Sequence, residues 1–317
     1  MFKFKANQKI FQIDKVKIGG QPGQLPKVLI GTIFYQNQKL VKDPKKGIFD
    51  KKKAKKLIEK QDELSQLTGN PCLIDIVCTS VESAHKYIDF VSEVTDTPIS
   101  VDIWNPKIKI DVLNYIAEVG LENRILYNSI ESPKPDEIEA IKESKIKAAI
   151  LLAYNIKNRT PKGVLSRLKG TKDQKGLIQI AKEAGIEKPI VDTTIFTYIP
   201  SIGAGSKACF LVKEEFGLPV GGAPGNATTV LKKLKGMKFY AKAVKAASQV
   251  VPLVMGADYL LYGLIESAPW IFPACATVDA MIAAAARIEF GTKILIENHP
   301  LYNLFPEFID ELKKVNL

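Results

Sequence analysis

The chain has 317 residues, 46% of them hydrophobic, and carries a formal net charge of +11 at pH 7. This length and hydrophobic content suffice for one large core, and no apolar run reaches the ~18 residues expected of a transmembrane helix. The opening Met1-Phe-Lys-Phe-Lys5 lacks the apolar stretch of a signal peptide, so we expect a cytoplasmic, water-soluble protein. Four cysteines without paired or metal-ligand spacing predict reduced, partly buried thiols; they are Cys72, Cys78, Cys209 and Cys275.

The N-terminal segment, residues 1–24, has the pattern of a β-hairpin. Apolar side chains recur at Ile10, Ile13, Val16 and Ile18, and Asp14-Lys15 lies between the two halves as a turn. We expect this ribbon to close the lower end of a barrel.

Eight apolar runs follow, separated by amphipathic stretches, and this favours alternating strands and helices. The expected strands are 28–35, 72–78, 99–104, 125–130, 148–155, 189–196, 218–222 and 259–266. The expected helices are 51–67, 80–94, 108–119, one after Pro135, one or two between 161 and 185, one after a loop at 201–205, then 226–251 and 275–290. We therefore expect an α/β fold, a (β/α)8 TIM barrel in one domain over residues 1–317, with a C-terminal helical extension at 294–317.

Lysines are densest between Lys42 and Lys60. Lys52, Lys55 and Lys56 share one face of the expected helix, which is typical of a solvated outer surface. The alternative is electrostatic attraction to an acidic protein or an anionic membrane surface. Aromatic residues are not interleaved with the lysines, which disfavours a nucleic-acid groove.

The predicted strands end in polar residues. These strand-end residues are Asp75, Asp102, Asn105, Asn128, Asn155, Asp192, Thr194, Asn226 and Glu266. In a barrel such residues converge on one cavity at the C-terminal face, although any one of them could instead cap a helix or a turn. The set lacks histidine and a phosphate-binding lysine motif, so it does not resemble a zinc hydrolase or a nucleotide-phosphate site, and no dinucleotide fingerprint is present.

Acids and amides together fit a planar, donor-rich heterocycle. A pterin presents a ring N–H beside an exocyclic amino group, and a carboxylate can accept both as it does from guanidinium. The loop Gly221-Gly-Ala-Pro-Gly-Asn226 can allow close backbone approach to a flat ligand, bind an anion or simply turn the chain.

Several segments resemble the MtrH family, the MtrH subunits of tetrahydromethanopterin S-methyltransferase. They include Gly19-Gly-Gln-Pro-Gly23, Gly31-Thr-Ile-Phe-Tyr35, Gly47-Ile-Phe-Asp-Lys51 and Leu261-Tyr-Gly-Leu-Ile-Glu266, and the resemblance runs from residue 1 to about 300. The family is similar in fold to pterin-binding barrels such as methyltetrahydrofolate:corrinoid methyltransferases and dihydropteroate synthase.

The resemblance implies a methyltransferase that moves a methyl group from N5 of methyl-tetrahydromethanopterin to the Co(I) of a cobamide held by a corrinoid-binding partner. In methanogens that partner belongs to a membrane-bound, Na⁺-translocating complex, and the MtrH protein is its cytoplasmic component, attached to the membrane only through partner subunits. A homodimer is suggested by the same resemblance.

The resemblance also implies roles for single residues, because the strand ends of this chain match those of the family. Asp102, Asn128, Asn155, Asp192 and Gly222 are expected to bind the pterin. Asn226 is expected beside N5, with Asp75 or Glu266 supplying a relayed proton to the leaving amine.

Departures at 157–161 and at 221–226 leave the carrier and the partner open. A stand-alone methyltransferase using tetrahydrofolate or tetrahydromethanopterin is one alternative, and a subunit that only docks a corrinoid protein is another. A dihydropteroate-synthase-like ligase would need a basic pair at the late strands, where Glu266 stands instead. We expect His85 and His299 to be surface or packing residues.

Overall fold

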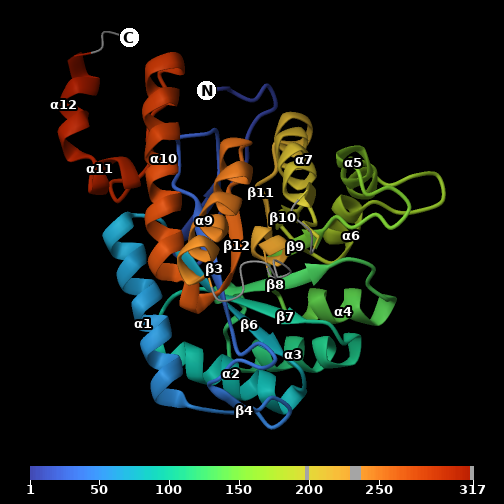
Figure 1. Cartoon of the computed structure of the whole chain (residues 1–317). Helices are drawn as coiled ribbons and strands as arrows, with labels where there is room; N and C mark the ends of the chain where they lie inside the picture. Colours follow the sequence, from blue (N-terminus) through green and yellow to red (C-terminus); the bar gives the residue numbers. More distant parts are fainter. Residues whose placement is uncertain (197–199, 229–236, 315–317) are drawn as a thin grey trace.

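The computed structural model describes residues 1–196, 200–228 and 237–314. Eight parallel strands close into a barrel in the order β10-β11-β12-β3-β6-β7-β8-β9, surrounded by helices (Figure 1). The strands are β3 (Val28–Ile33), β6 (Cys72–Cys78), β7 (Ile99–Ile103), β8 (Ile125–Ile130), β9 (Ala148–Leu152), β10 (Lys188–Asp192), β11 (Val220–Gly222) and β12 (Tyr259–Leu264). The predicted TIM barrel is thereby confirmed.

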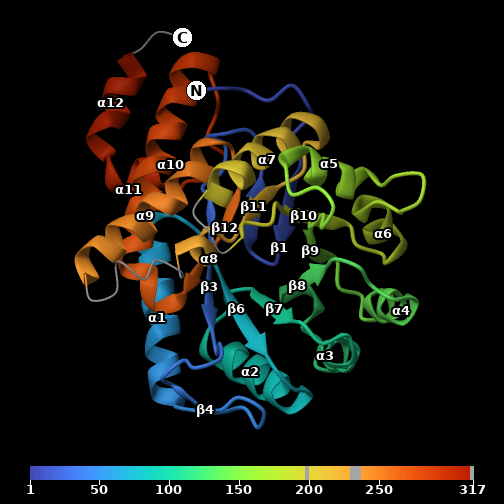
Figure 2. The ribbon, with the colours of Figure 1, turned by 45° about the vertical axis from the view of Figure 1, so that its right-hand side comes forward.

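Helices connect successive strands and form the outer layer (Figure 2). They are α1 (Lys51–Thr68), α2 (Val81–Val94), α3 (Pro106–Glu118), α4 (Pro135–Glu143), α5 (Pro161–Lys169), α6 (Leu177–Glu183), α7 (Pro200–Phe216), α8 (Pro224–Thr228), α9 (Lys238–Val254), α10 (Ala268–Phe290), α11 (Pro300–Leu304) and α12 (Pro306–Lys314). Short polar side chains set where some begin: Asp50 accepts from the Lys53 amide at the start of α1, and Ser80 forms a capping box with Ser83 at α2.

The predicted N-terminal hairpin is present as β1 (Ile10–Ile13) and β2 (Val16–Gly19). Ile13, Val16 and Ile18 are buried in one cluster with residues near the N-terminal ends of the barrel strands, among them Val28 and Leu73. Burying these side chains closes the lower end of the barrel, as the alternating pattern predicted.

One expected loop is part of a helix. Residues 201–205 lie in the first turns of α7 and not in a connection before it. The glycines that suggested a loop are partly explained by packing, because a Cβ on Gly205 would stand 2.6 Å from Cγ1 of Ile195. Within the expected helix 226–251, the structure describes α8 and α9, and residues 229–236 lie outside the described part. Glu266 lies in the short 3₁₀ helix η3 (Ile265–Ser267) and not in β12.

Helix α10 is more apolar than we predicted from the sequence, where no run was expected to reach the length of a transmembrane helix. The segment Ile265–Phe290 contains an 18-residue window with a mean hydropathy of 1.5 and is long enough to cross a membrane by length and composition alone. Half of its most apolar window is buried within the protein. Its buried Asp279 accepts a hydrogen bond of 2.7 Å from the Lys27 amide. We therefore interpret α10 as a covering helix of the barrel.

A buried ion pair joins α7 to the lower end of the barrel. The Nζ of Lys213 donates to both carboxylate oxygens of Asp258, each at 2.8 Å, and to the carbonyl oxygen of Gly20 at 2.6 Å. Asp258 also accepts from the amide of Val220 at 3.1 Å. Both side chains are 1% exposed, so the Lys213 charge depends on Asp258 for its compensation, while Asp258 also has the buried Nζ of Lys27 at 4.0 Å.

Replacing Lys213 by methionine is expected to destabilise the fold by about 3–5 kcal/mol. The Asp258 carboxylate would stay buried with the more distant Lys27, at 4.0 Å, as its counter-charge. Urea denaturation followed by circular dichroism measures this loss. The matched control is Lys60→Met, which breaks an exposed pair with Glu63 at 2.8 Å and is expected to cost less than about 1 kcal/mol. Equal losses in the two variants would contradict a stabilising role for the buried pair.

Candidate functional site

A cavity of about 460 Å³ lies at the C-terminal ends of the barrel strands. Its lining comes from most of the strands and from the loops that follow them, as expected for the site-bearing face of a TIM barrel. The polar residues of the lining include Thr32, Asp75, Asp102, Asn128, Asp192, Thr194 and Asn226. The barrel therefore brings together most of the strand-end residues that the sequence singled out.

Asp75 at the base of this cavity is 2% exposed and fully engaged. It accepts hydrogen bonds from Thr32 Oγ1 at 2.9 Å, Ser100 Oγ at 2.7 Å and Asn128 Nδ2 at 3.3 Å. Burial raises the pKa of the Asp75 carboxyl, and these three donors oppose the rise. Because the Asn128 amide nitrogen is directed to Asp75, its oxygen remains to accept a hydrogen bond from a ligand.

Asp102 and Asp192 are the two other strand-end carboxyls of the cavity, whose lining also includes Glu131. Burial raises the pKa of Asp102 to about 8; the charges of Asp75 and Asp192 add to the rise, and the charge of Lys109 opposes it. Burial raises the pKa of Asp192 to about 6, opposed by the Thr194 amide, which donates to Oδ1 at 2.6 Å. Asp192 therefore ionises at a lower pH than Asp102, which makes Asp192 the stronger hydrogen-bond acceptor near neutral pH.

Lys109 is a cation of the lining that the sequence analysis missed. Its Nζ donates to the carbonyl oxygen of Ser129 at 2.8 Å and to Oε1 of Glu137 at 3.2 Å. Tyr127 also donates to that Glu137 oxygen, at 2.7 Å. The sequence could have indicated this position, because residue 109 lies three positions before the apolar Val112 and so falls on the same inner face of the helix.

Asn155 does not line the cavity. Its Nδ2 donates to the carbonyl oxygen of Gly163 at 3.2 Å, and its Oδ1 accepts from the amides of Lys157 and Asn158. The side chain thus organises the connection between β9 and α5. Asn105 likewise caps α3, since its Oδ1 accepts from the Lys107 amide. The pterin-binding role of Asn155 stays a prediction.

Glu266 and Gly222 also lie outside the lining. Oε1 of Glu266 accepts from Gln38 Nε2 at 2.9 Å and from the hydroxyl of Tyr35 at 3.3 Å, and Tyr35 itself lines the cavity. A Cβ on Gly222 would meet side-chain atoms of Thr193 and Ile195 at 3.3 Å. Glu266 is therefore linked to the cavity lining through Tyr35. The predicted roles of Glu266 and Gly222 remain open.

Exposed apolar side chains follow the strand ends around the cavity. Trp104, which follows β7 and lines the cavity, is 83% exposed. Ile156 follows β9 and is 69% exposed, while Phe239 and Tyr240 at the start of α9 are 79% and 60% exposed. We call these four the rim residues. Large apolar side chains left in water beside a polar cavity indicate a contact surface.

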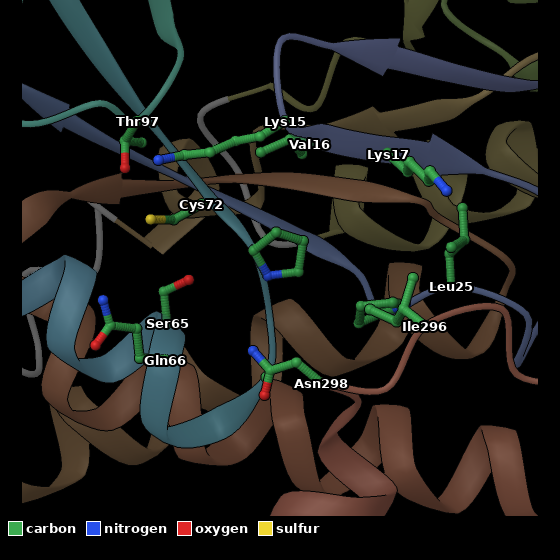
Figure 3. Close-up of a pocket in the computed structure, with 13 residues that line it drawn as sticks. Lys15, Val16, Lys17, Leu25, Ser65, Gln66, Cys72, Thr97, Ile296 and Asn298 are labelled. Atoms are coloured by element: carbon green, nitrogen blue, oxygen red, sulfur yellow. The ribbon is translucent and has the colours of Figure 1, made fainter.

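A second cavity, of about 310 Å³, lies at the opposite, N-terminal end of the barrel (Figure 3). Lys15 and Lys17 of the hairpin border it together with Ser65 and Gln66 at the end of α1 and Asn298. No acidic residue belongs to its lining among the residues that the structure describes. It therefore lacks the carboxyls that the C-terminal cavity offers, and we take the latter as the candidate site.

Within residues 1–196, 200–228 and 237–314, no group of three or more histidine, cysteine, aspartate or glutamate side chains could hold a metal ion. The four cysteines are free and buried, which agrees with the predicted thiols. His299 is also buried, and burial lowers its pKa to about 3, so it packs as a neutral ring.

Comparison with known sequences gives a consistent result. The model of the family described as "Tetrahydromethanopterin S-methyltransferase MtrH subunit" matches residues 6–295. The MtrH protein of this methyltransferase from Methanopyrus kandleri is 41% identical, covering 92% of this chain and 96% of the relative. The MtrH protein from Methanothermobacter thermautotrophicus is 38% identical, covering 96% of this chain and all of the relative.

Solved structures show the same architecture. Dihydropteroate synthase from Yersinia pestis, in a sulfonamide complex, superposes with a TM-score of 0.58 at 15% identity over 87% of this chain and all of that chain. The Coxiella burnetii dihydropteroate synthase, in complex with pteroic acid, has a TM-score of 0.56 at 17% identity over 88% and 99% of the two chains. At this identity the likeness concerns the barrel fold.

Proposed function

Because the chain belongs to the MtrH family of tetrahydromethanopterin S-methyltransferase subunits, we propose that its cavity binds methyl-tetrahydromethanopterin and presents the N5 methyl group to the Co(I) of a partner-held corrinoid. The protein is a methyltransferase by family. The main support for the proposed residue roles is that one cavity is lined by Asp102, Asn128, Asp192 and Asn226 together.

The lining matches the hydrogen-bonding edge of a pterin. The ring offers donors at N8–H, the 2-amino group and N3–H, and the cavity supplies carboxyl and amide oxygens. Ionised Asp192 can accept the 2-amino group and N3–H together. The Asn128 oxygen, which is directed away from Asp75, can accept a further hydrogen bond from the ring beside Asp192. Asp102 then faces the N8 side of the ring, and the carboxyls on both sides hold the ring flat.

The chemistry needs orientation and a stabilised leaving group. The N5–methyl bond breaks with its electron pair left on N5, which takes up a proton, and the methyl group bonds to the cobalt of the corrinoid acceptor. Co(I) is itself a strong nucleophile, so no base or covalent residue is required of this chain. The side chain of Asn226, in the short helix α8 that follows β11, can hydrogen-bond N5 as charge develops there.

The acceptor must reach the methyl group from outside the barrel. We therefore assign the rim residues, Trp104, Ile156, Phe239 and Tyr240, to contact with the corrinoid-binding partner. Exposed aromatic side chains dominate many protein–protein contacts. The net charge of +11 would speed the encounter with an acidic partner.

Replacing Phe239 by alanine is expected to raise the KM for the corrinoid protein about tenfold, because an exposed aromatic contact is lost. The rate with free cob(I)alamin should not change, since that acceptor makes no rim contact. The control is Leu67→Ala, which removes a 63% exposed side chain at the end of α1, away from the cavity. An equal KM in the wild type and Phe239→Ala would contradict the assignment of this surface.

Family membership also bears on assembly. Relatives are named as one subunit of the methyltransferase, which implies partner subunits. We propose that the chain works in the cytoplasm and reaches the membrane only through those subunits. A homodimer remains a prediction. Use of tetrahydrofolate with a stand-alone corrinoid protein, and a docking role without catalysis, are the competing functions.

Calorimetric titration separates these possibilities before any turnover is measured. Tetrahydromethanopterin and tetrahydrofolate would be titrated separately into the purified chain. The proposal predicts saturable binding of tetrahydromethanopterin that is tighter than binding of tetrahydrofolate. A preference for tetrahydrofolate would favour the stand-alone alternative. Binding of neither, in folded protein, would contradict the pterin site and favour the docking role.

A further inference from the structure

Lys245 is a second cation of the cavity lining, and its environment differs from that of Lys109. It lies on α9 and is half-buried beside the cavity. Lys109 is neutralised by Glu137 at 3.2 Å. Lys245 has no carboxylate within ion-pair distance among the residues that the structure describes, so its charge faces a cavity without a compensating protein partner.

The helix presents this lysine inward. Ser248 and Gln249, three and four positions further along α9, are buried, so residue 245 lies on the same inner face. Lys242 lies one turn earlier and is exposed, with its Nζ 4.7 Å from the centre of the Trp270 ring. A lysine normally extends its ammonium to open water. Lys245 instead borders the site that is proposed to hold the pterin.

The order of groups around the barrel indicates which ligand atom meets Lys245. The strands follow one another around the barrel in the order β7, β8, β9, β10 and β11. Asp102 belongs to β7, Asn128 to β8 and Asp192 to β10, and β11 leads to α8 and α9. Around a pterin the order is N8–H, N1, the 2-amino group, N3–H, the carbonyl O4 and N5. With Asp192 on the 2-amino group and N3–H, the next ligand atom is O4. O4 is an acceptor and requires a donor.

We propose that the Lys245 ammonium donates to O4 of the bound pterin and so selects the 2-amino-4-oxo ring, an inference that rests on the proposed function. The carboxylate of Asp192 and the ammonium of Lys245 then match the donor–donor–acceptor edge of the ring. O4 and N5 lie side by side on the pterin. The same positive charge therefore stands close to the nitrogen that receives the electron pair in methyl transfer.

The test compares two small probes that differ at position 4. One is 6-methyltetrahydropterin, which carries the O4 acceptor, and the other is its 2,4-diamino counterpart, which presents an amino donor there. Calorimetry should show that the wild type prefers the oxo probe by about 100-fold, because a buried donor facing a donor is left unpaired. In Lys245→Met this ratio should fall to within about threefold, and Lys245→Arg should retain most of it.

The controls separate specificity from folding. Lys242→Met removes the neighbouring exposed lysine and should keep the wild-type ratio, and thermal melting of each variant checks the fold. An unchanged ratio in folded Lys245→Met would overturn the inference and leave the proposed function standing. Failure of the wild type to bind either probe or tetrahydromethanopterin would instead overturn the proposed function itself.

Discussion

Replacing Asp192 by asparagine is expected to weaken tetrahydropterin binding by about 100-fold, the largest effect on affinity that we expect from a single residue. The ionised carboxylate accepts two donors of the ring, and an amide at that position would direct an N–H against one of them. Calorimetric titration of tetrahydromethanopterin measures the loss. A change of less than about threefold would remove Asp192 from the pterin site.

The pH dependence of binding gives an independent signature. Burial raises the pKa of Asp192 to about 6, so wild-type affinity should rise as the pH increases through that value and the carboxyl ionises. The asparagine variant should lack this step. Its stability at neutral pH should equal or exceed that of the wild type, because a raised folded-state pKa means that ionisation of Asp192 costs folding free energy as the pH rises. An unstable variant would indicate a structural role instead.

Replacing Asn226 by alanine is expected to lower kcat by about 100-fold with a much smaller change in pterin affinity. Its amide is assigned to N5, where negative charge develops only as the methyl group leaves, so the contact strengthens in the transition state. Single-turnover methyl transfer to cob(I)alamin at saturating pterin measures this step directly. A variant that loses affinity in proportion to rate would place Asn226 in ground-state binding.

Asn155→Ala is the matched control for that substitution. It removes the same functional group from the same end of the barrel, but its hydrogen bonds lie within the connection between β9 and α5. Its kcat at saturating pterin should remain within about threefold of the wild type, whether or not Asn155 contributes to pterin affinity. An equal loss in both variants would mean that the rate reports disturbance of the barrel face and not contact with N5.

The barrel was predictable because its signals are local. Strands 72–78 and 125–130 were predicted with the bounds that the structure shows, since apolar runs bounded by turn residues need no tertiary information. The convergence of Asp75, Asp102, Asn128 and Asp192 then follows from the fold, because the C-terminal ends of parallel barrel strands face one cavity.

Side-chain direction beyond the strand ends was not predictable. Glu266 lies in a 3₁₀ turn and contacts Tyr35, a partner 231 positions away in the chain. Nothing in the sequence around Asn155 distinguishes a side chain that bonds its own loop from one that faces a ligand. Lys109 and Lys245 lie on helices, and periodicity indicates their inner faces without indicating that those faces border a cavity.

The most direct test of the methyltransferase account is an anaerobic spectrophotometric assay. Purified protein is mixed with cob(I)alamin and methyl-tetrahydromethanopterin, and the absorbance of Co(I) is followed against time. We predict loss of the Co(I) spectrum at a rate that depends on the protein and falls sharply in Asp192→Asn and Asn226→Ala. No loss with folded protein, repeated with methyl-tetrahydrofolate and with a cognate corrinoid protein as acceptor, would contradict it.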